Sequence, residues 1–190
     1  MAVRNGSLKE RLIEEGLREI AEHGVQNFSM RRVAAACGVS CAAPYKHFSD
    51  KEEFFAALID YIAGIWKERQ NRVLESCQPD NRSRLVALSV EYVRFLVENP
   101  HVRSLIMTQY KEFDEAYSNM RSRMSNKSRR ILVEYCREVN MPQDVYRRKI
   151  MVVRSLIFGA ALLFDSGEIE YNEEALKDLE YNIGREFLIP

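Results

Sequence analysis

Apolar residues recur every three or four positions along the chain, a spacing that predicts amphipathic helices. In the first segment, six apolar residues share one helical face: Leu8, Leu12, Ile13, Leu17, Ile20 and Ala21. Gly24 can end this helix, because glycine readily adopts the left-handed conformation of a helix cap. No alternation of apolar and polar residues persists for more than a few positions. The pattern therefore predicts an all-α protein of about nine helices.

Capping signals divide this pattern into segments. Ser29 can cap a short second helix over residues 30–37, and Ser40 can cap a third short helix that ends at Phe48. The remaining segments are a long helix from a capping-box signal at residues 49–53 to about Ser76, one helix that ends at Asn99, and segments near 101–110, 115–139, 143–164 and 172–187.

Composition narrows the class of protein. The chain has 190 residues, of which 46% are hydrophobic, so it can build a substantial core. The longest uncharged apolar stretch, residues 155–164, is about half of the roughly 20 residues that a membrane span needs. The first residues lack the apolar region of a secretory signal, and four cysteines in this length do not indicate a disulfide framework. We expect a cytoplasmic protein with reduced thiols.

The net charge of zero conceals charge segregation. Residues 118–154 contain ten Lys and Arg against three Asp and Glu, whereas residues 155–190 contain two against eight. Residues 25–51 contain four basic side chains and one acidic side chain. A small basic region near the N-terminus is compatible with local contact to nucleic acid.

The short segments around Gly38 have the steric features of a helix-turn-helix. Two helices that cross steeply over a three- or four-residue turn need a residue that tolerates positive φ, and Gly38 supplies it. Ala34 is small enough to permit close approach of the next helix, and Val39 can fill the angle between the two. In this motif the second helix lies in the major groove of DNA.

The run from Phe28 to Ser40 (FSMRRVAAACGVS), followed by Tyr45-Lys46-His47-Phe48 and Lys51, resembles the DNA-binding domain of the TetR family of bacterial repressors. The resemblance covers roughly residues 8–58. It implies a helix-turn-helix domain over residues 1–52 and a ligand-binding and dimerisation domain over residues 53–190. It also implies a homodimer that binds a palindromic operator in double-stranded DNA and releases it when a small molecule binds.

Carried over by position, this resemblance implies ten DNA-binding residues. Phosphate contacts are expected from Ser29, Tyr45, Lys46, His47 and Lys51, with the Ser40 hydroxyl at the start of the predicted third helix; base contacts are expected from Arg31, Cys41, Ala42 and Ala43. Alanines donate no hydrogen bonds, so direct readout would rest on Arg31 and Lys46, with DNA shape supplying the remainder. The alternatives are that Tyr45 fills the core, that His47 packs, and that Arg31 and Arg32 are solvated surface.

Two residue sets are candidates for the second domain. An apolar ligand pocket is predicted from Trp66, Tyr92, Phe95, Met107, Tyr110, Phe113 and Tyr117, against the alternative of ordinary core. The ligand would be hydrophobic or aromatic, or cationic if Glu91 or Glu112 faced inward. A four-helix dimer interface is predicted from Leu156, Gly159, Ala160, Leu163, Leu179 and Ile183, against the alternative of a monomeric core.

An enzyme is disfavoured because the sequence brings no acid, base or nucleophile into a recognisable motif. His23, His47 and His101 are scattered, and neither a phosphate-binding glycine loop nor a zinc signature is present. A metal or redox site at Cys37, Cys41 and His47 would distort the turn, so we expect no metal and no cofactor. The remaining alternatives are a transcriptional activator of the same fold and a helical protein–protein adaptor.

Overall fold

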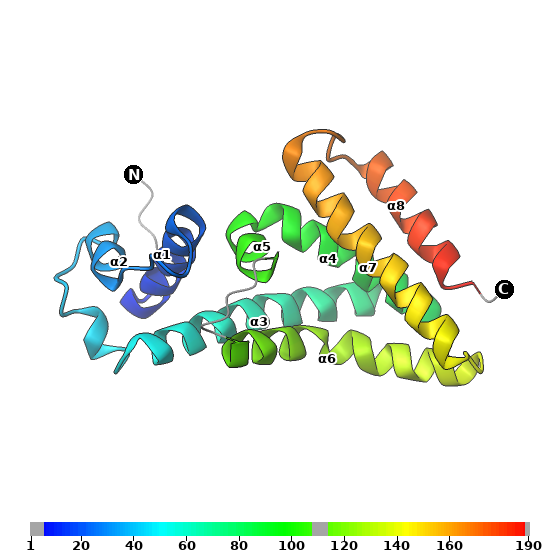
Figure 1. The fold of residues 1–190 in the computed structure, drawn as a ribbon, viewed down its shortest axis with the longest axis horizontal. Helices are drawn as coiled ribbons and strands as arrows, with labels where there is room; N and C mark the ends of the chain where they lie inside the picture. The colour runs from blue at the N-terminus through cyan, green and yellow to red at the C-terminus, as the bar shows by residue number, and fades with distance from the viewer. Residues whose placement is uncertain (1–5, 108–113, 189–190) are drawn as a thin grey trace. The chain divides into compact units, whose positions relative to one another are not determined.

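The computed structural model describes the backbone of residues 6–107 and 114–188, and the side chains of these residues except 104, 107 and 114–121. Every regular element in these two ranges is a helix, which confirms the predicted all-α class (Figure 1). The elements are α1 (Leu8–His23), α2 (Met30–Ala36), the 3-10 helix η1 (Pro44–Lys46), α3 (Lys51–Ser76), α4 (Asn81–Glu98), α5 (Pro100–Met107), α6 (Asp114–Glu138), α7 (Gln143–Ser166) and α8 (Glu173–Glu186).

The chain divides into two compact units. Unit 1 comprises Met1–Ile65 and Asn99–Arg123, and unit 2 comprises Trp66–Glu98 and Met124–Pro190. Helix α3 begins in unit 1 and ends in unit 2. Unit 1 thus contains the whole predicted DNA-binding segment, the first part of α3 and all of α5.

The core of unit 1 is built around the Phe54 ring of α3, which has no exposed surface. Its centroid lies 5.4 Å from that of Phe28 and 4.9 Å from that of Phe48. The buried face of α1, with Leu12 and Ile20 almost completely covered, belongs to the same unit. This aromatic packing, tilted against Phe28 and edge-to-face against Phe48, holds α3 against the segments that precede it.

Gly16 lets α1 approach Phe54 closely. A Cβ atom at this position would lie 2.4 Å from the Phe54 Cζ atom, which is far inside van der Waals contact. We expect Gly16→Ala to lower the free energy of unfolding by up to about 2 kcal/mol, because overpacking outweighs the gain in helix propensity. Thermal denaturation checks this expectation. Gly64→Ala on α3 is the matched control, since a Cβ there meets no atom within 4 Å; equal stabilisation of both variants would contradict the tight packing.

In unit 2, helices α4, α7 and α8 pack on one another (Figure 1). Val93 of α4, Ala161 of α7 and Ile183 of α8 are fully buried within this single chain. The end of α3 contributes Trp66, whose indole N–H donates a hydrogen bond to the Met124 carbonyl at 2.8 Å. This hydrogen bond satisfies the buried indole N–H and holds the Trp66 ring in one orientation.

Most predicted helix boundaries agree with the structure. The long helix over residues 51–76 is confirmed, and the helices predicted at 115–139, 143–164 and 172–187 differ from α6, α7 and α8 by no more than two residues at each end. The exception is the third helix, which was predicted to extend from Ser40 to Phe48. Only the single turn η1 forms there.

Candidate nucleic-acid interface

Helix α2 is fixed at both ends by the residues that the sequence singled out. The Ser29 hydroxyl accepts a hydrogen bond from the Arg32 N–H, which confirms Ser29 as the N-cap. Gly38 has φ +71°, and the N–H groups of Gly38 and Val39 donate to the carbonyls of Ala35 and Ala34. This pair of bonds is a Schellman motif, which requires the left-handed residue that glycine supplies. The Arg11 guanidinium closes the same end by donating to the Cys37 carbonyl at 2.6 Å.

The segment after this turn corrects the prediction of an α-helix. Pro44 has no N–H, so it cannot make the bond to the Ser40 carbonyl that an α-helix would need. The chain forms bonds three residues apart instead, from Ala43 N–H to the Ser40 carbonyl and from His47 N–H to the Pro44 carbonyl. Ser40 therefore supplies its carbonyl to a turn, and its hydroxyl is not the cap of a helix.

The predicted DNA-contacting residues lie on the surface of unit 1. Ser29 and Ala43 are half-buried, and the others are exposed: Arg31, Ser40, Cys41, Ala42, Tyr45, Lys46, His47 and Lys51. Tyr45 is 57% exposed, so the alternative that it fills the core is wrong. Phe48, which is 1% exposed, occupies the core in its place.

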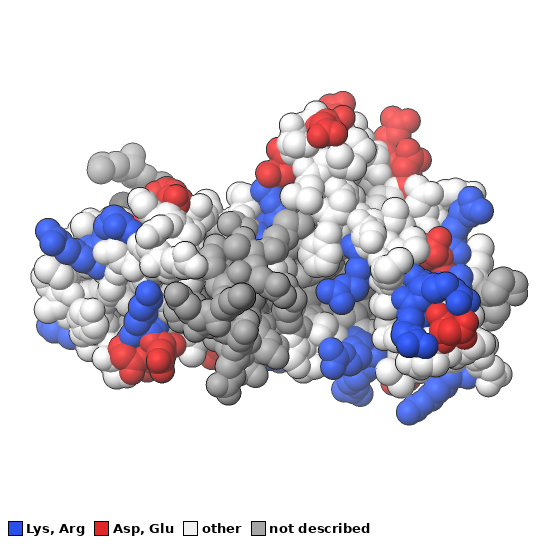
Figure 2. Space-filling model, in the orientation of Figure 1, with Lys and Arg blue, Asp and Glu red and all other residues white. Residues whose placement is uncertain are grey.

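Basic side chains gather on this part of unit 1, where Figure 2 shows blue groups around the position of α2 in Figure 1. The Lys51 ammonium lies 5.4 Å from the centre of the Phe28 ring and 5.6 Å from that of Phe55. These cation–π contacts hold the lysine at the start of α3. The Lys9 ammonium lies similarly over Phe48, at 5.4 Å.

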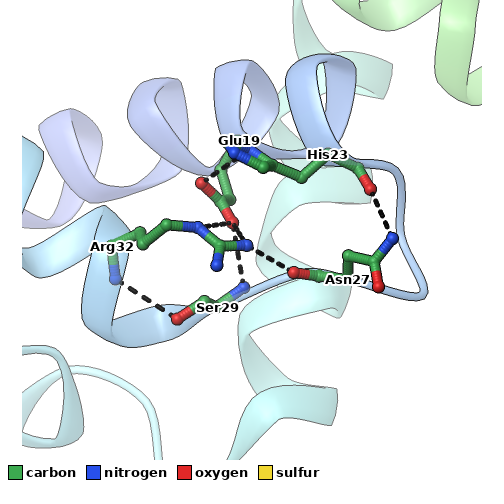
Figure 3. Close-up of polar contacts among 5 residues, drawn as sticks. All are labelled: Glu19, His23, Asn27, Ser29 and Arg32. Carbon is green, nitrogen blue, oxygen red and sulfur yellow. Dashed lines mark hydrogen bonds and ion pairs between the residues drawn. The ribbon is translucent and has the colours of Figure 1, made fainter.

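The two adjacent arginines of α2 differ in their surroundings. Both are exposed, but Arg32 also donates from Nε to the Glu19 carboxylate at 2.8 Å and from Nη2 to the Asn27 carbonyl (Figure 3). Glu19 is only 7% exposed and also accepts from the Ser29 N–H at 3.1 Å. Burial alone would raise the pKa of Glu19, but the hydrogen bonds from Arg32 and Ser29 lower it below its usual value.

Three of the predicted pocket residues form one aromatic cluster in unit 2. The Trp66 centroid lies 4.9 Å from Tyr92 and 5.3 Å from Phe95. Trp66 and Phe95 are buried, and Tyr92 is half-buried. Tyr110 and Phe113 lie outside the described residues, as do the side chains of Met107 and Tyr117.

Carboxylates beside this cluster are already paired. Glu91 lies 3.2 Å from Arg69, which also pairs with Glu98. Burial raises the pKa of Glu91, and the Arg69 charge acts against that rise. Glu112, the other candidate partner for a cation, lies outside the described residues.

The predicted interface residues fall into two groups. Leu156, Gly159, Ala160 and Leu163 of α7 are half-buried, and exposed Met151, Val152 and Leu162 lie on the same helix. Leu179 and Ile183 of α8 are buried by their own chain, and Ile183 has no exposed surface. Ile183 therefore stabilises the interior of unit 2 and cannot contact a partner.

The described ranges contain no group of three or more His, Cys, Asp or Glu side chains that could hold a metal ion. Cys37 is buried under the turn and Cys41 is exposed. Within the same ranges, no helix is long and apolar enough to cross a membrane.

Residues 12–58, which contain most of α1, all of α2 and the turn, match the family model described as "Bacterial regulatory proteins, tetR family". This segment is therefore similar to the TetR family of bacterial regulatory proteins. The helical fold is that of TetR-family regulators of known structure, as the resemblance implied.

Relatives and solved structures extend this likeness beyond the matched segment. The chain is 28% identical over 170 residues to a protein named nucleoid occlusion factor SlmA from Photobacterium profundum, covering 87% of this chain and 83% of that one. A TetR-family transcription regulator from Marinobacter aquaeolei has a similar fold, with a TM-score of 0.74, 18% identity and 94% of each chain covered. The regulator FadR from Bacillus subtilis, solved with stearoyl-CoA, has a TM-score of 0.73 and 15% identity over 94% of this chain and 96% of that one.

Sequence reasoning missed two residues that shape the interface. Gly16 interrupts an otherwise strong helical segment, and a glycine there is a signal of close packing. Glu19 is a charged residue next to the apolar Ile20, and its burial follows from a partner 13 positions away. No local pattern indicates that partner.

Proposed function

We propose that the chain is a repressor whose homodimer binds a palindromic operator and releases it when a small hydrophobic molecule binds. The observation that carries this proposal is the exposure of Arg31, Tyr45, Lys46 and Lys51 around the turn at Gly38, within the segment that matches the TetR family model. Residues 1–52 would bind DNA, and residues 53–190 would bind the ligand and the partner protomer. Such a protein works where the chromosome is, in the cytoplasm, and needs no enzymatic activity.

A second copy of the chain is the proposed occupant of the exposed face of α7. This face has exposed apolar side chains at Met151 and Leu162 around half-buried Gly159. A Cβ at Gly159 would meet no atom within 4 Å, so the helix surface there leaves room for close approach of another helix. A DNA-binding domain this small gains specific affinity by occupying two half-sites, which favours the dimer.

The proposed effector has an apolar body and a hydrogen-bond acceptor. Gln70 of α3 is 3% exposed, and its amide nitrogen has no hydrogen-bond partner among the described residues. A buried donor of this kind needs a water or a ligand group to satisfy it. It lies about one helical turn after Trp66, on the same side of α3 as that aromatic residue. Because Arg69 already pairs with Glu91, a cationic ligand is disfavoured. The stearoyl-CoA in FadR of Bacillus subtilis supports the apolar class.

Selection of bound sequences from random duplex DNA tests the proposal. We expect a palindrome whose half-sites lie about one helical turn of DNA apart, with affinity falling steeply between low and moderate salt. Absence of salt-dependent binding to any duplex would favour the adaptor. A regulated gene whose expression falls on deletion of the protein would indicate the activator. A compound that releases the selected DNA would identify the effector class.

Lys46→Ala is expected to weaken binding to all duplex sequences by about tenfold, because it removes one charged phosphate contact. The plot of log K against log salt should become shallower by about 0.9, the value for one released counterion. Fluorescence anisotropy at several salt concentrations measures both quantities. Lys177→Ala on α8 is the matched control, since Lys177 is also an exposed lysine but lies in unit 2; an unchanged slope for Lys46→Ala would remove Lys46 from the interface.

A further inference from the structure

A polar network joins α1 to the beginning of α2 (Figure 3). At its centre, the buried Glu19 carboxylate of α1 accepts hydrogen bonds from the Ser29 N–H at 3.1 Å and from Arg32 Nε at 2.8 Å. His23 Nδ1 lies 3.3 Å from the other carboxylate oxygen. The Glu19 carboxylate thus holds both Ser29, the N-cap residue of α2, and the side chain of Arg32 in the first turn of α2.

The same network fixes the loop between the two helices. Arg32 Nη2 donates to the Asn27 carbonyl, and the Asn27 side-chain amide donates to the His23 carbonyl at 3.1 Å. The planar guanidinium is therefore used as a fork: Nε and Nη2 both reach Glu19, and Nη2 also reaches the loop backbone. The end of α1, the loop and the start of α2 are held as one rigid group.

This geometry separates Arg32 from its neighbour. If Arg32 turned outward to a phosphate, the Glu19 carboxylate would remain buried beside unpaired backbone, a state with a large desolvation cost. Arg31, on the same short helix, makes none of the contacts of this network, although both arginines are exposed. The two arginines therefore have different roles, although the sequence presents them side by side.

We propose that Glu19 and Arg32 are positioning residues: they set the orientation of α2, so that Ser29 and Arg31 can contact DNA, and Arg32 itself contacts no phosphate. This inference rests on the proposed function, since it concerns the same DNA-binding surface. In this role, Arg32 acts through the planar geometry of its guanidinium and not through its positive charge alone.

Arg32→Lys separates the two roles, because lysine keeps the positive charge but lacks the planar pair of donors, Nε and Nη2, that binds Glu19. We expect about tenfold weaker binding to the selected operator, with the slope of log K against log salt unchanged. Arg31→Lys and Arg31→Ala are the matched controls: the first should keep the slope, and the second should make it shallower by about 0.9. All measurements are made at a temperature at which circular dichroism shows each variant to be folded.

Glu19→Gln supplies an independent variant that keeps the side-chain volume and does not depend on Arg32 substitutions folding. We expect it to weaken binding to a similar degree with the slope unchanged. Combined with Arg32→Lys, it should weaken binding no more than the larger single effect, because both residues act in one unit.

Three results would overturn the proposal. Native affinity in Arg32→Lys together with a shallower slope in Arg32→Leu would make Arg32 a phosphate contact. Additive losses in the double variant would show that the residues act separately. Lower melting temperatures with native affinity would restrict the pair to a structural role. These outcomes presuppose that the native chain binds duplex DNA; if it does not, the proposed function fails first and the positioning role fails with it.

Discussion

Gly159→Glu is expected to convert the protein into monomers that bind the operator about 10²–10⁴ times more weakly than the native protein. This loss of affinity is expected because the two DNA-binding domains of the proposed dimer would no longer be linked. Each half-site would then be bound by a separate monomer, without the high effective concentration that a linked second domain has. Within one protomer the substitution should be tolerated, since a Cβ at position 159 meets no atom within 4 Å. In a close-packed interface, the same carboxylate would be buried without a partner.

Sedimentation velocity measures the oligomeric state, and anisotropy with the full palindrome and with a single half-site measures the binding. Gly64→Glu is the matched control, because it places the same charge on another open glycine position of a helix, on α3. We expect that variant to have native assembly. If Gly159→Glu remained dimeric, the exposed face of α7 would not be the interface, and Ala160 and Leu163 would be removed from it as well.

Phe54→Ala is expected to lower the free energy of unfolding by about 3–5 kcal/mol. The ring has no exposed surface, and it contacts the rings of Phe28, Phe48 and Phe55 with centroid distances of 5.4, 4.9 and 6.2 Å. Its removal leaves a cavity that the neighbouring rings cannot fill without leaving their own positions. Chemical denaturation followed by circular dichroism measures the change.

Tyr45→Ala provides the contrast within the same unit. Its ring is 57% exposed, so we expect a change of less than about 0.5 kcal/mol in stability but a clear loss of DNA affinity. A loss below about 1 kcal/mol in Phe54→Ala would show that the aromatic cluster is not the centre of this core.

The ends of α2 could be predicted because their chemistry is local. Ser29 caps the helix with its own hydroxyl, and Gly38 ends it with a conformation that few other residues adopt. The extent of the next helix was predicted wrongly, although the decisive residue was visible. Ser40 favoured an α-helix because serine is a common N-cap residue. Pro44, however, lacks the N–H that would donate to the Ser40 carbonyl, and only the 3-10 turn η1 forms.

The features that could not be predicted from the sequence depend on contacts with residues far away in the chain. Arg31 and Arg32 look alike in the sequence, and the difference between them depends on Glu19, which lies on another helix. In unit 2, an apolar position such as Ile183 could pack against its own chain or against a second copy. Periodicity shows that such a face will be covered, and it does not show by which chain.

The composition of the turn at residues 41–43 has a consequence for engineering. Cys41 and Ala42 are exposed, Ala43 is half-buried, and neither alanine offers a hydrogen-bonding group to a base. New side chains at Cys41 and Ala42 would extend into solvent with little cost to folding. A library randomised at these two positions could therefore redirect the protein to other promoters while its scaffold stays intact.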